Sequence, residues 1–190
     1  MEIFDIVDAG GAPTGQTVTR SEAHAKGIRH RTAQIWVFRE WEGRPQVLLQ
    51  KRSRDKDSWP GCLDTSAAGH IDAGEEPLPS ALRELEEELG IRARPEELLP
   101  LGLYRHRSEE VFYGKPFIDD EVSFVYLYRE PVELVRLRPQ PGEVEAVGWY
   151  GLQETIDAVV SGDPRYCLRP EGIGMVKEWW MGSGGSAPQR

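Results

Sequence analysis

Seven carboxylate residues lie within 17 positions near the middle of the chain, and a single basic residue, Arg83, lies among them. The seven are Asp72, Glu75, Glu76, Glu84, Glu86, Glu87 and Glu88. At about 100° per residue, Glu84, Glu87 and Glu88 share one face of a helix. Like charges at these spacings repel one another, and a hard divalent cation such as Mg²⁺ relieves the repulsion by binding carboxylate oxygens. The spacing therefore predicts a metal platform, with an exposed and inert acidic helix face as the alternative.

A helix over residues 77–90 must carry these glutamates. Leu78, Leu82, Leu85 and Leu89 recur at intervals of four, three and four, which makes one apolar stripe far around the helix from the glutamates. Prolines are tolerated in the first turn of a helix, and a glycine suits the position after its last turn. The stripe is expected to anchor the helix to a hydrophobic core.

The other elements are inferred from apolar runs and turn residues. Predicted strands cover residues 2–8, 16–19, 34–38, 46–50, 98–106, 122–128 and 144–150, and predicted helices cover 152–161 and 172–181. The first two strands form an N-terminal hairpin over about residues 2–19, and residues 108–117 are expected to form a long loop. Few helices among many strands indicate an α/β or α+β sandwich. We expect a single domain over residues 1–181 and a disordered tail over 182–190.

The composition limits the classes of function. The chain has 190 residues, with 23 Lys and Arg against 32 Asp and Glu, and a formal net charge of −9. This acidity excludes a coat for nucleic-acid polymers and a polybasic membrane binder, since both need clustered positive charge. Cys62 and Cys167 are the only cysteines, so a reducing compartment fits better than a disulfide framework. Because the first residues lack a signal-peptide pattern and no apolar run approaches the ~20 residues of a membrane span, we expect a cytoplasmic protein.

The acidic segment resembles the signature motif of a known family. Gly69, Glu75 and the run Arg-Glu-Leu-Glu-Glu-Glu-Leu-Gly-Ile at 83–91 match the Nudix box, residues 69–91, at each of its fixed positions. The chain is thereby similar to the Nudix hydrolases. The resemblance implies an α/β fold, an α/β/α sandwich with a mixed β-sheet. It also implies that the protein binds Mg²⁺ or Mn²⁺ and cleaves a diphosphate linked to another moiety.

The same resemblance implies roles for the residues of the box. The implied metal ligands are Glu84, Glu87, Glu88 and the carbonyl of Gly69. Arg83 would orient the glutamates by ion pairing, and Glu75 would support the loop before the helix. Gly74 and Gly90 are expected to serve the backbone conformation.

Hydrolysis of a diphosphate requires charge neutralisation and a nucleophile. Bound Mg²⁺ neutralises phosphate oxygens and lowers the pKa of a coordinated water, so we expect metal-activated water to attack a phosphorus of the P–O–P bridge. A general base must then accept the proton of that water. Glu87, Glu143 and Glu121 are the candidates, and the sequence leaves the choice among them open.

A second and narrower resemblance covers most of residues 1–150. Segments 20–24, 30–31, 48–53, 59–61 and 69–70 look like those of the isopentenyl-diphosphate isomerase branch of the superfamily. In that branch a His and Glu cluster binds an additional metal ion. The matching residues here are His24, His30, His70, Asp119 and Glu121, a sensible set of nitrogen and oxygen ligands. The alternatives are histidines that serve only in hydrogen bonding and a solvated turn at 119–121.

The chain departs from the isomerases at Ala68. The isomerases carry their catalytic cysteine immediately before the Gly-His pair, where this chain has Ala68, Gly69 and His70. Alanine neither donates nor accepts the proton that allylic isomerisation requires, and Cys62 lies six residues earlier. The sequence therefore favours a hydrolase built on an isomerase-like scaffold.

Basic residues beside the box are the candidates for binding substrate phosphates. These are Arg52, Lys51 and Arg31, and Lys51 and Arg52 point to opposite sides of a strand, so at most one of the two faces the site. Their alternative role is that of ordinary surface charges. The resulting hypothesis is a pyrophosphohydrolase that acts on a nucleoside diphosphate, a nucleoside triphosphate or a conjugate of these. An isomerase and a non-catalytic nucleotide-binding module are the alternatives, and a homodimer stays open.

Overall fold

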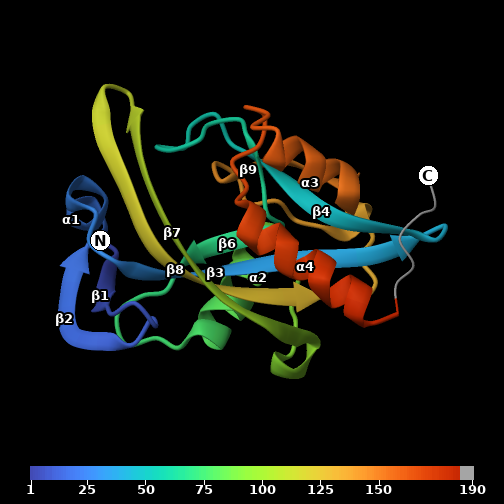
Figure 1. Ribbon diagram of the computed structural model, residues 1–190, viewed down its shortest axis with the longest axis horizontal. Helices are drawn as coiled ribbons and strands as arrows, with labels where there is room; N and C mark the ends of the chain where they lie inside the picture. The colour runs from blue at the N-terminus through green and yellow to red at the C-terminus, as the bar shows by residue number, and fades with distance from the viewer. Residues whose placement is uncertain (185–190) are drawn as a thin grey trace.

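The computed structural model describes residues 1–184, and a mixed seven-stranded sheet forms its centre (Figure 1). The strands of this sheet are β3 (His30–Trp41), β4 (Arg44–Arg52), β5 (Leu63–Asp64), β6 (Ala67–His70), β7 (Leu98–Phe112), β8 (Lys115–Tyr128) and β9 (Val144–Gly151). Their order is β5-β4-β3-β8-β7, with β6 paired to β3 and β9 paired to β4. The β3–β8 pair is parallel and the other pairs are antiparallel.

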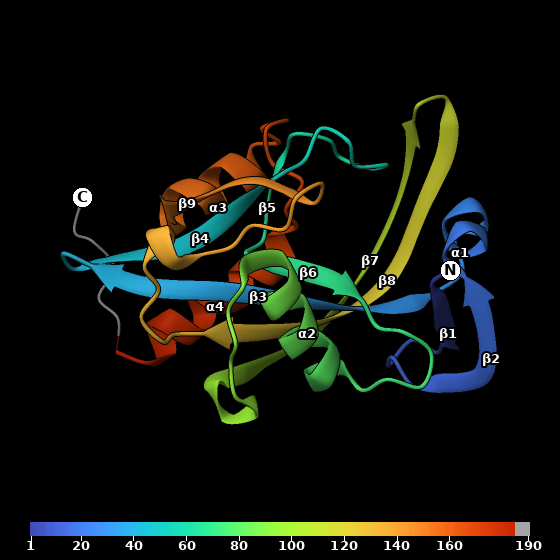
Figure 2. The same ribbon diagram turned by 180° about the vertical axis from the view of Figure 1, so that it is seen from behind.

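Helices cover both faces of this sheet. Helix α2 (Pro77–Leu89) lies on one face, and helices α3 (Leu152–Val160) and α4 (Pro170–Gly182) lie on the other, as the two opposite views show (Figure 1, Figure 2). Two single turns of 3₁₀ helix lie in connecting segments: η1 (Pro95–Glu97) between α2 and β7, and η2 (Leu134–Arg136) between β8 and β9. The arrangement is the predicted sandwich of helix, sheet and helix.

Strand β3 supplies side chains to the hydrophobic cores on both faces because successive residues of a strand point in opposite directions. Ile35 and Val37 pack in the core under α2, whereas Trp36 and Phe38 pack in the core under α3 and α4. Within α2, Leu85 and Leu89 are fully buried, and Leu78 and Leu82 pack at the edge of the same core. The predicted leucine stripe is thereby confirmed, and it fixes the rotation of α2 on the sheet.

The N-terminal hairpin is followed by a helix that the sequence analysis did not predict. Strands β1 (Ile3–Val7) and β2 (Pro13–Thr19) pair antiparallel, and α1 (Arg20–Lys26) follows immediately. Thr19 caps α1 by accepting a hydrogen bond from the backbone N–H of Glu22, and Gly27 ends it in a left-handed conformation. A seven-residue helix has little stability of its own, so its packing through Ala23 against Phe4 holds it in place.

The predicted loop over residues 108–117 is wrong, because this segment extends β7 and β8 into a long hairpin. The pairing continues from Arg107↔Asp120 to Phe112↔Lys115, with Tyr113 and Gly114 in the turn. Both turn residues have positive φ, 51° and 77°, as a two-residue hairpin turn requires. In Figure 1 the hairpin projects from the sheet beside α1.

Within residues 1–184, no helix combines the length and the apolar character needed to cross a membrane. Helix α4 ends at Gly182, the first residue of the predicted tail, and Ser183 N–H bonds to carbonyl oxygens of its last turn. The rest of that tail, from residue 185 on, lies outside the described residues.

Candidate active site

Helix α2 packs against β6 and places the carboxylate of Glu84 directly over Gly69. A Cβ atom on Gly69 would lie 2.2 Å from Glu84 Cδ, so only a glycine allows the carboxylate to approach the strand this closely. The Glu84 side chain is 12% exposed, and its burial raises its pKa. Two of the four metal ligands that the resemblance implies, Glu84 and Gly69, are therefore adjacent.

Glu88 lies one helical turn further along α2 and is buried. Its Oε2 accepts hydrogen bonds from Gln50 Nε2 at 2.9 Å and from the Ala68 N–H at 3.0 Å. Burial raises the pKa of Glu88 to about 8, because the charged carboxylate loses more hydration than these two bonds restore. A nearby divalent cation would supply the missing stabilisation, so this carboxylate fits a metal site.

Arg83 connects several residues of the box. Its Nη1 lies 2.6 Å from Glu84 Oε1 and 3.4 Å from Glu87 Oε2. Its Nη2 donates to the His70 carbonyl at 3.2 Å and lies 3.5 Å from Glu75 Oε2, which also accepts from Ser80. These contacts agree with an orienting arginine and a supporting Glu75. Glu87 is more exposed to solvent than Glu84 and Glu88, with half of its side chain exposed.

The two other glycines of the box occupy backbone turns. Gly90 follows the last turn of α2 at φ 73° and donates its N–H to the Glu86 carbonyl. Gly74 has φ 80° and donates its N–H to Asp5 Oδ2 at 2.9 Å. Both conformations favour glycine over residues with a side chain.

The predicted histidine cluster is assembled from four elements next to the platform. The β3–β8 pairing puts His30 beside Glu121, β6 contributes His70, and α1 contributes His24. One ligand atom from each histidine lies within 4.8 Å of the others. Glu121 Oε1 is 3.6 Å from His30 Nε2 and 3.9 Å from His70 Nε2. His24 Nδ1 is 3.0 Å from Asp119 Oδ1.

Several ring nitrogens of the histidine cluster are buried and have no hydrogen-bond partner among the described residues. Nδ1 of His30 donates its hydrogen to the Ile28 carbonyl at 2.8 Å, so in the neutral ring Nε2 carries the lone pair. Nε2 of all three histidines is buried without a partner among the described residues. Unpaired buried nitrogens around a carboxylate fit a metal ion, because metal coordination satisfies them together.

Charge in this cluster is concentrated on Glu121. Burial acts to raise its pKa, but the neighbouring histidines outweigh burial and lower the pKa to about 2. Burial lowers the pKa of His70 well below its usual value. Burial also acts to lower the pKa of His30, but the contact with Glu121 and its other polar neighbours outweigh burial and raise it. Asp119 and Glu121 belong to β8 and not to a solvated turn, and Asp120 points to the other face and pairs with Arg29.

A single cavity of about 360 Å³ contains both groups. Its lining includes the three glutamates of the platform, Gly69 and Ala68, two of the three clustered histidines, Asp119 and Glu121. Nine carboxylate residues and five Lys or Arg residues line it, a formal excess of four negative charges. An anionic substrate is repelled by this lining unless cations are bound, which is a further reason to place metal ions here.

The candidate phosphate-binding residues do not all reach this cavity. Arg52 lines it, and its guanidinium pairs with Asp64 at 3.1 Å and donates to the Ser58 carbonyl. Lys51 points away, as the strand alternation predicts, and pairs with Glu145 at 2.8 Å. Arg31 is buried outside the cavity and bonds to Asp5 and to the Glu75 carbonyl. Of the three predicted phosphate ligands, Arg52 lines the cavity whereas Lys51 and Arg31 do not, so the geometry favours Arg52 over the other two.

All three candidate bases line the cavity, but their surroundings differ. Glu143 forms an ion pair with Lys56. Glu121 is held among the histidines and has a low pKa, which makes it a poor proton acceptor. Glu87 has the most exposed side chain of the platform, and among the described residues its one ion pair is with Arg83 at 3.4 Å.

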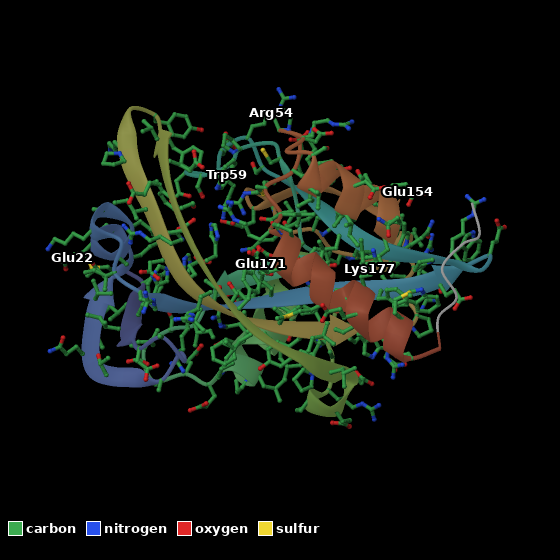
Figure 3. All side chains as sticks on the ribbon, viewed as in Figure 1. Glu22, Arg54, Trp59, Glu154, Glu171 and Lys177 are labelled. Atoms are coloured by element: carbon green, nitrogen blue, oxygen red, sulfur yellow. The ribbon has the colours of Figure 1, made fainter. Side chains whose placement is uncertain are left out.

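The β7–β8 hairpin and the loop between β4 and β5 form two walls above the cavity. The ring of Phe112 contacts that of Trp59 edge to face at 5.3 Å, and the Tyr113 hydroxyl donates to the Lys56 carbonyl. Phe117 stacks on the ring of His24 at 4.3 Å. Figure 3 marks Trp59 on the loop that faces the hairpin.

Some residues that line the cavity or contact its lining carried no signal in the sequence. Gln50, which orients Glu88, lies in an apolar strand run, and Tyr104 and His106 lie in β7 without a motif around them. Arg169 immediately precedes α4 and is far along the chain from the box. These residues reach the site only through tertiary packing.

Comparison with known proteins connects this geometry to a family. The NUDIX domain matches residues 28–168. The chain is 40% identical over 167 residues to "Nudix hydrolase 3" of Arabidopsis thaliana, covering 87% of this chain and 21% of that protein. It is 34% identical over 151 residues to an isopentenyl-diphosphate Delta-isomerase of Roseobacter denitrificans, covering 79% of this chain and 80% of that protein.

The fold has a counterpart among solved structures. The crystal structure of DR0079 from Deinococcus radiodurans superimposes with a TM-score of 0.62 at 19% identity, covering 85% of this chain and 90% of that one. At this identity the likeness establishes the fold, and it confirms the predicted α/β/α sandwich with a mixed sheet.

Proposed function

The chain belongs to the Nudix family, and we propose that it hydrolyses the P–O–P bond of a nucleoside diphosphate, a nucleoside triphosphate or a conjugate of these. The observation that carries the proposal is the platform of Glu84, Glu87 and Glu88, which shares one cavity with an orphaned histidine cluster. The curated relative of Arabidopsis thaliana is named a Nudix hydrolase, and this chain spans about a fifth of its length. Nudix hydrolases generally use divalent metals, and the acidic lining fits that requirement.

Metal binding is assigned to two groups of residues. Glu84, Glu87, Glu88 and the Gly69 carbonyl would hold Mg²⁺ or Mn²⁺ at the platform, and the three histidines with Glu121 would hold a second ion. When bound, such ions neutralise phosphate oxygens and make a coordinated water more acidic.

Side chains of the box position the metal ligands and accept the proton of the attacking water. Arg83 holds the Glu84 carboxylate at 2.6 Å and is itself held by Glu75 and the His70 carbonyl. This chain of contacts keeps Glu84 in one rotamer. Glu87 accepts the proton of the attacking water, because its carboxylate faces the cavity and half of it remains exposed to solvent.

Ala68 separates this proposal from isomerisation. It lines the cavity beside Gly69, and its methyl group offers no proton to a double bond. Its backbone N–H bonds to Glu88 instead. The position thus supports the metal platform and supplies no acid or base, even though several curated relatives are isomerases.

A ³¹P NMR panel tests the proposal directly. The purified protein is incubated with Mg²⁺ and, separately, with nucleoside diphosphates, nucleoside triphosphates, nucleotide sugars and isopentenyl diphosphate. We expect cleavage of a P–O–P bond in at least one nucleotide class and no allylic product. Glu84→Gln serves as the inactive control. Absence of cleavage throughout the panel overturns the proposal, and an allylic product assigns the isomerase reaction instead.

A further inference from the structure

Five Lys or Arg residues line the cavity, and they differ in how the protein neutralises them. These are Arg20, Arg52, Lys56, Arg83 and Arg169. The first four pair with carboxylates within 4 Å. Among the residues that the structure describes, Arg169 is the cavity cation without such a partner. Its positive charge therefore remains available to a bound molecule.

Arg169 is held in position by neutral groups from two other segments. Its Nη2 donates to Ser108 Oγ on β7 at 3.1 Å. The centre of its guanidinium lies 5.9 Å from the ring of Trp59, on the loop between β4 and β5. Figure 3 marks Trp59 and also Glu171, which follows Arg169 by two residues at the start of α4. These partners restrict the side chain without cancelling its charge. One of its five N–H donors bonds to Ser108, and the other four do not.

The charged and titratable groups near Arg169 do not neutralise its positive charge. Burial and the nearby Arg169 both lower the pKa of His106, so its ring is neutral at neutral pH. Among the described residues Glu171 forms no ion pair with Arg169, and it is an exposed residue at the start of α4, although its charge acts on His106. Asp119 and Glu121 are engaged by the histidine cluster.

We propose that Arg169 binds the terminal phosphate of the substrate, the phosphate that the carboxylate platform does not hold. A terminal phosphate carries nearly two negative charges and three free oxygens, and a guanidinium binds two such oxygens at once. In a cavity with an excess of four carboxylates, this group needs its own cation. The inference rests on the proposed hydrolysis, and within that class it favours nucleotides whose phosphate chain has a free end over capped conjugates.

Steady-state kinetics of Arg169→Gln test this assignment. For a nucleoside triphosphate with Mg²⁺ we expect KM to rise about 10- to 100-fold, with kcat changed by less than about threefold. For a nucleoside diphosphate capped by a sugar, which has no terminal phosphate, both constants should stay within about threefold of wild type. Arg169→Lys keeps the charge and should recover part of the affinity. Arg165→Gln removes an exposed arginine of the same segment, paired with Asp163, and should leave both substrates unaffected.

Two outcomes overturn the assignment: an unchanged KM for the triphosphate, or an equal rise for both substrates. Calorimetric binding of a methylene-bridged nucleoside diphosphate with Mg²⁺ separates this inference from the proposed function, because it needs no cleavage. Weaker binding by Arg169→Gln than by wild type supports Arg169 even if the protein hydrolyses nothing in the panel. Equal binding by the two proteins, or no binding by wild type, contradicts it. The melting temperatures of both variants show whether the fold is intact.

Discussion

Glu84 on helix α2 and Gly69 on strand β6 are packed so closely that a Cβ on the glycine would lie 2.2 Å from the Glu84 Cδ. Packing at this distance fixes the height of the carboxylate above the sheet. The glycine is therefore a part of the platform as much as the glutamates are, although it supplies only its backbone.

Gly69→Ala should displace Glu84 and lower kcat/KM by about 100-fold, since a shift near 1 Å in a positioned group has that effect. The free energy of unfolding should fall by about 1–3 kcal/mol through overpacking. Gly174→Ala is the matched control, because nothing lies within 4 Å of its Cβ position. Activity and urea denaturation of both variants check this prediction. Full activity in Gly69→Ala would show that the contact does not position Glu84.

Glu87→Gln should lower kcat by about 100- to 10,000-fold, the range for loss of a general base. The melting temperature should stay close to that of wild type, because the side chain is half exposed and only its contact with Arg83 is lost. Glu86→Gln is the control on the same helix, since Glu86 is exposed and pairs with Arg92 outside the cavity. Retention of wild-type turnover in Glu87→Gln would assign the base to another residue, with Glu143 the next to be replaced.

Glu88 predicts an unusual dependence of stability on pH in metal-free protein. Its pKa is about 8 in the folded state and near 4.5 in the unfolded chain, so the folded state binds the proton more tightly. Stability therefore falls as pH rises from about 4.5 to about 8, and the loss is complete above that range. Glu88→Gln removes this loss and should stabilise the protein by roughly 1–3 kcal/mol at alkaline pH.

Thermal melting in a chelator at about pH 5 and about pH 8.5 measures this effect. The gain from Glu88→Gln should be clearly larger at the higher pH, and Glu86→Gln should show no such difference. Addition of Mg²⁺ at the higher pH should raise the melting temperature of wild type more than that of Glu88→Gln. An equal gain at both pH values would contradict the assignment of a buried, protonated Glu88.

The histidine cluster predicts a second metal site that is independent of the platform. Titration with Co²⁺, followed by visible absorption, should give a saturable signal in wild type, because imidazole ligands suit transition metals. The double variant His24→Gln/His70→Gln should lose that signal. Glu84→Gln should retain it, since that residue belongs to the platform and not to the cluster. An unchanged signal in the double variant would place the bound ion elsewhere.

Local patterns predict α2 and its role better than any other part of the fold. The leucine spacing indicates the helix, its buried face and the side on which Glu84 and Glu87 emerge, and all of these depend only on neighbours in the sequence. Glu88 is the exception. The acidic face does not reveal that this carboxylate is buried, because its partners Gln50 and Ala68 come from distant strands.

Other elements depend on tertiary contacts that local patterns do not contain. The hairpin over residues 108–117 mixes charges with a Tyr-Gly turn, and its strands are stabilised by pairing with each other beyond the sheet. Helix α1 has seven residues and is held by Ala23 in the N-terminal cluster. The role of Arg31 also depends on tertiary contacts. Its partner Asp5 lies in the N-terminal hairpin, and local patterns predict that hairpin but not where it packs against the sheet.

The N-terminal hairpin and α1 lie before residue 28, where the family match begins. Yet α1 supplies His24, and Phe4 of β1 stacks on the rings of His30 and His70 at 4.9 and 4.5 Å. An expression fragment trimmed to the matched domain would keep every carboxylate of the platform while removing one wall of the histidine cluster. The matched domain alone therefore retains His30, His70 and Glu121 but lacks His24, so the three-histidine cluster is complete only with the leading 27 residues.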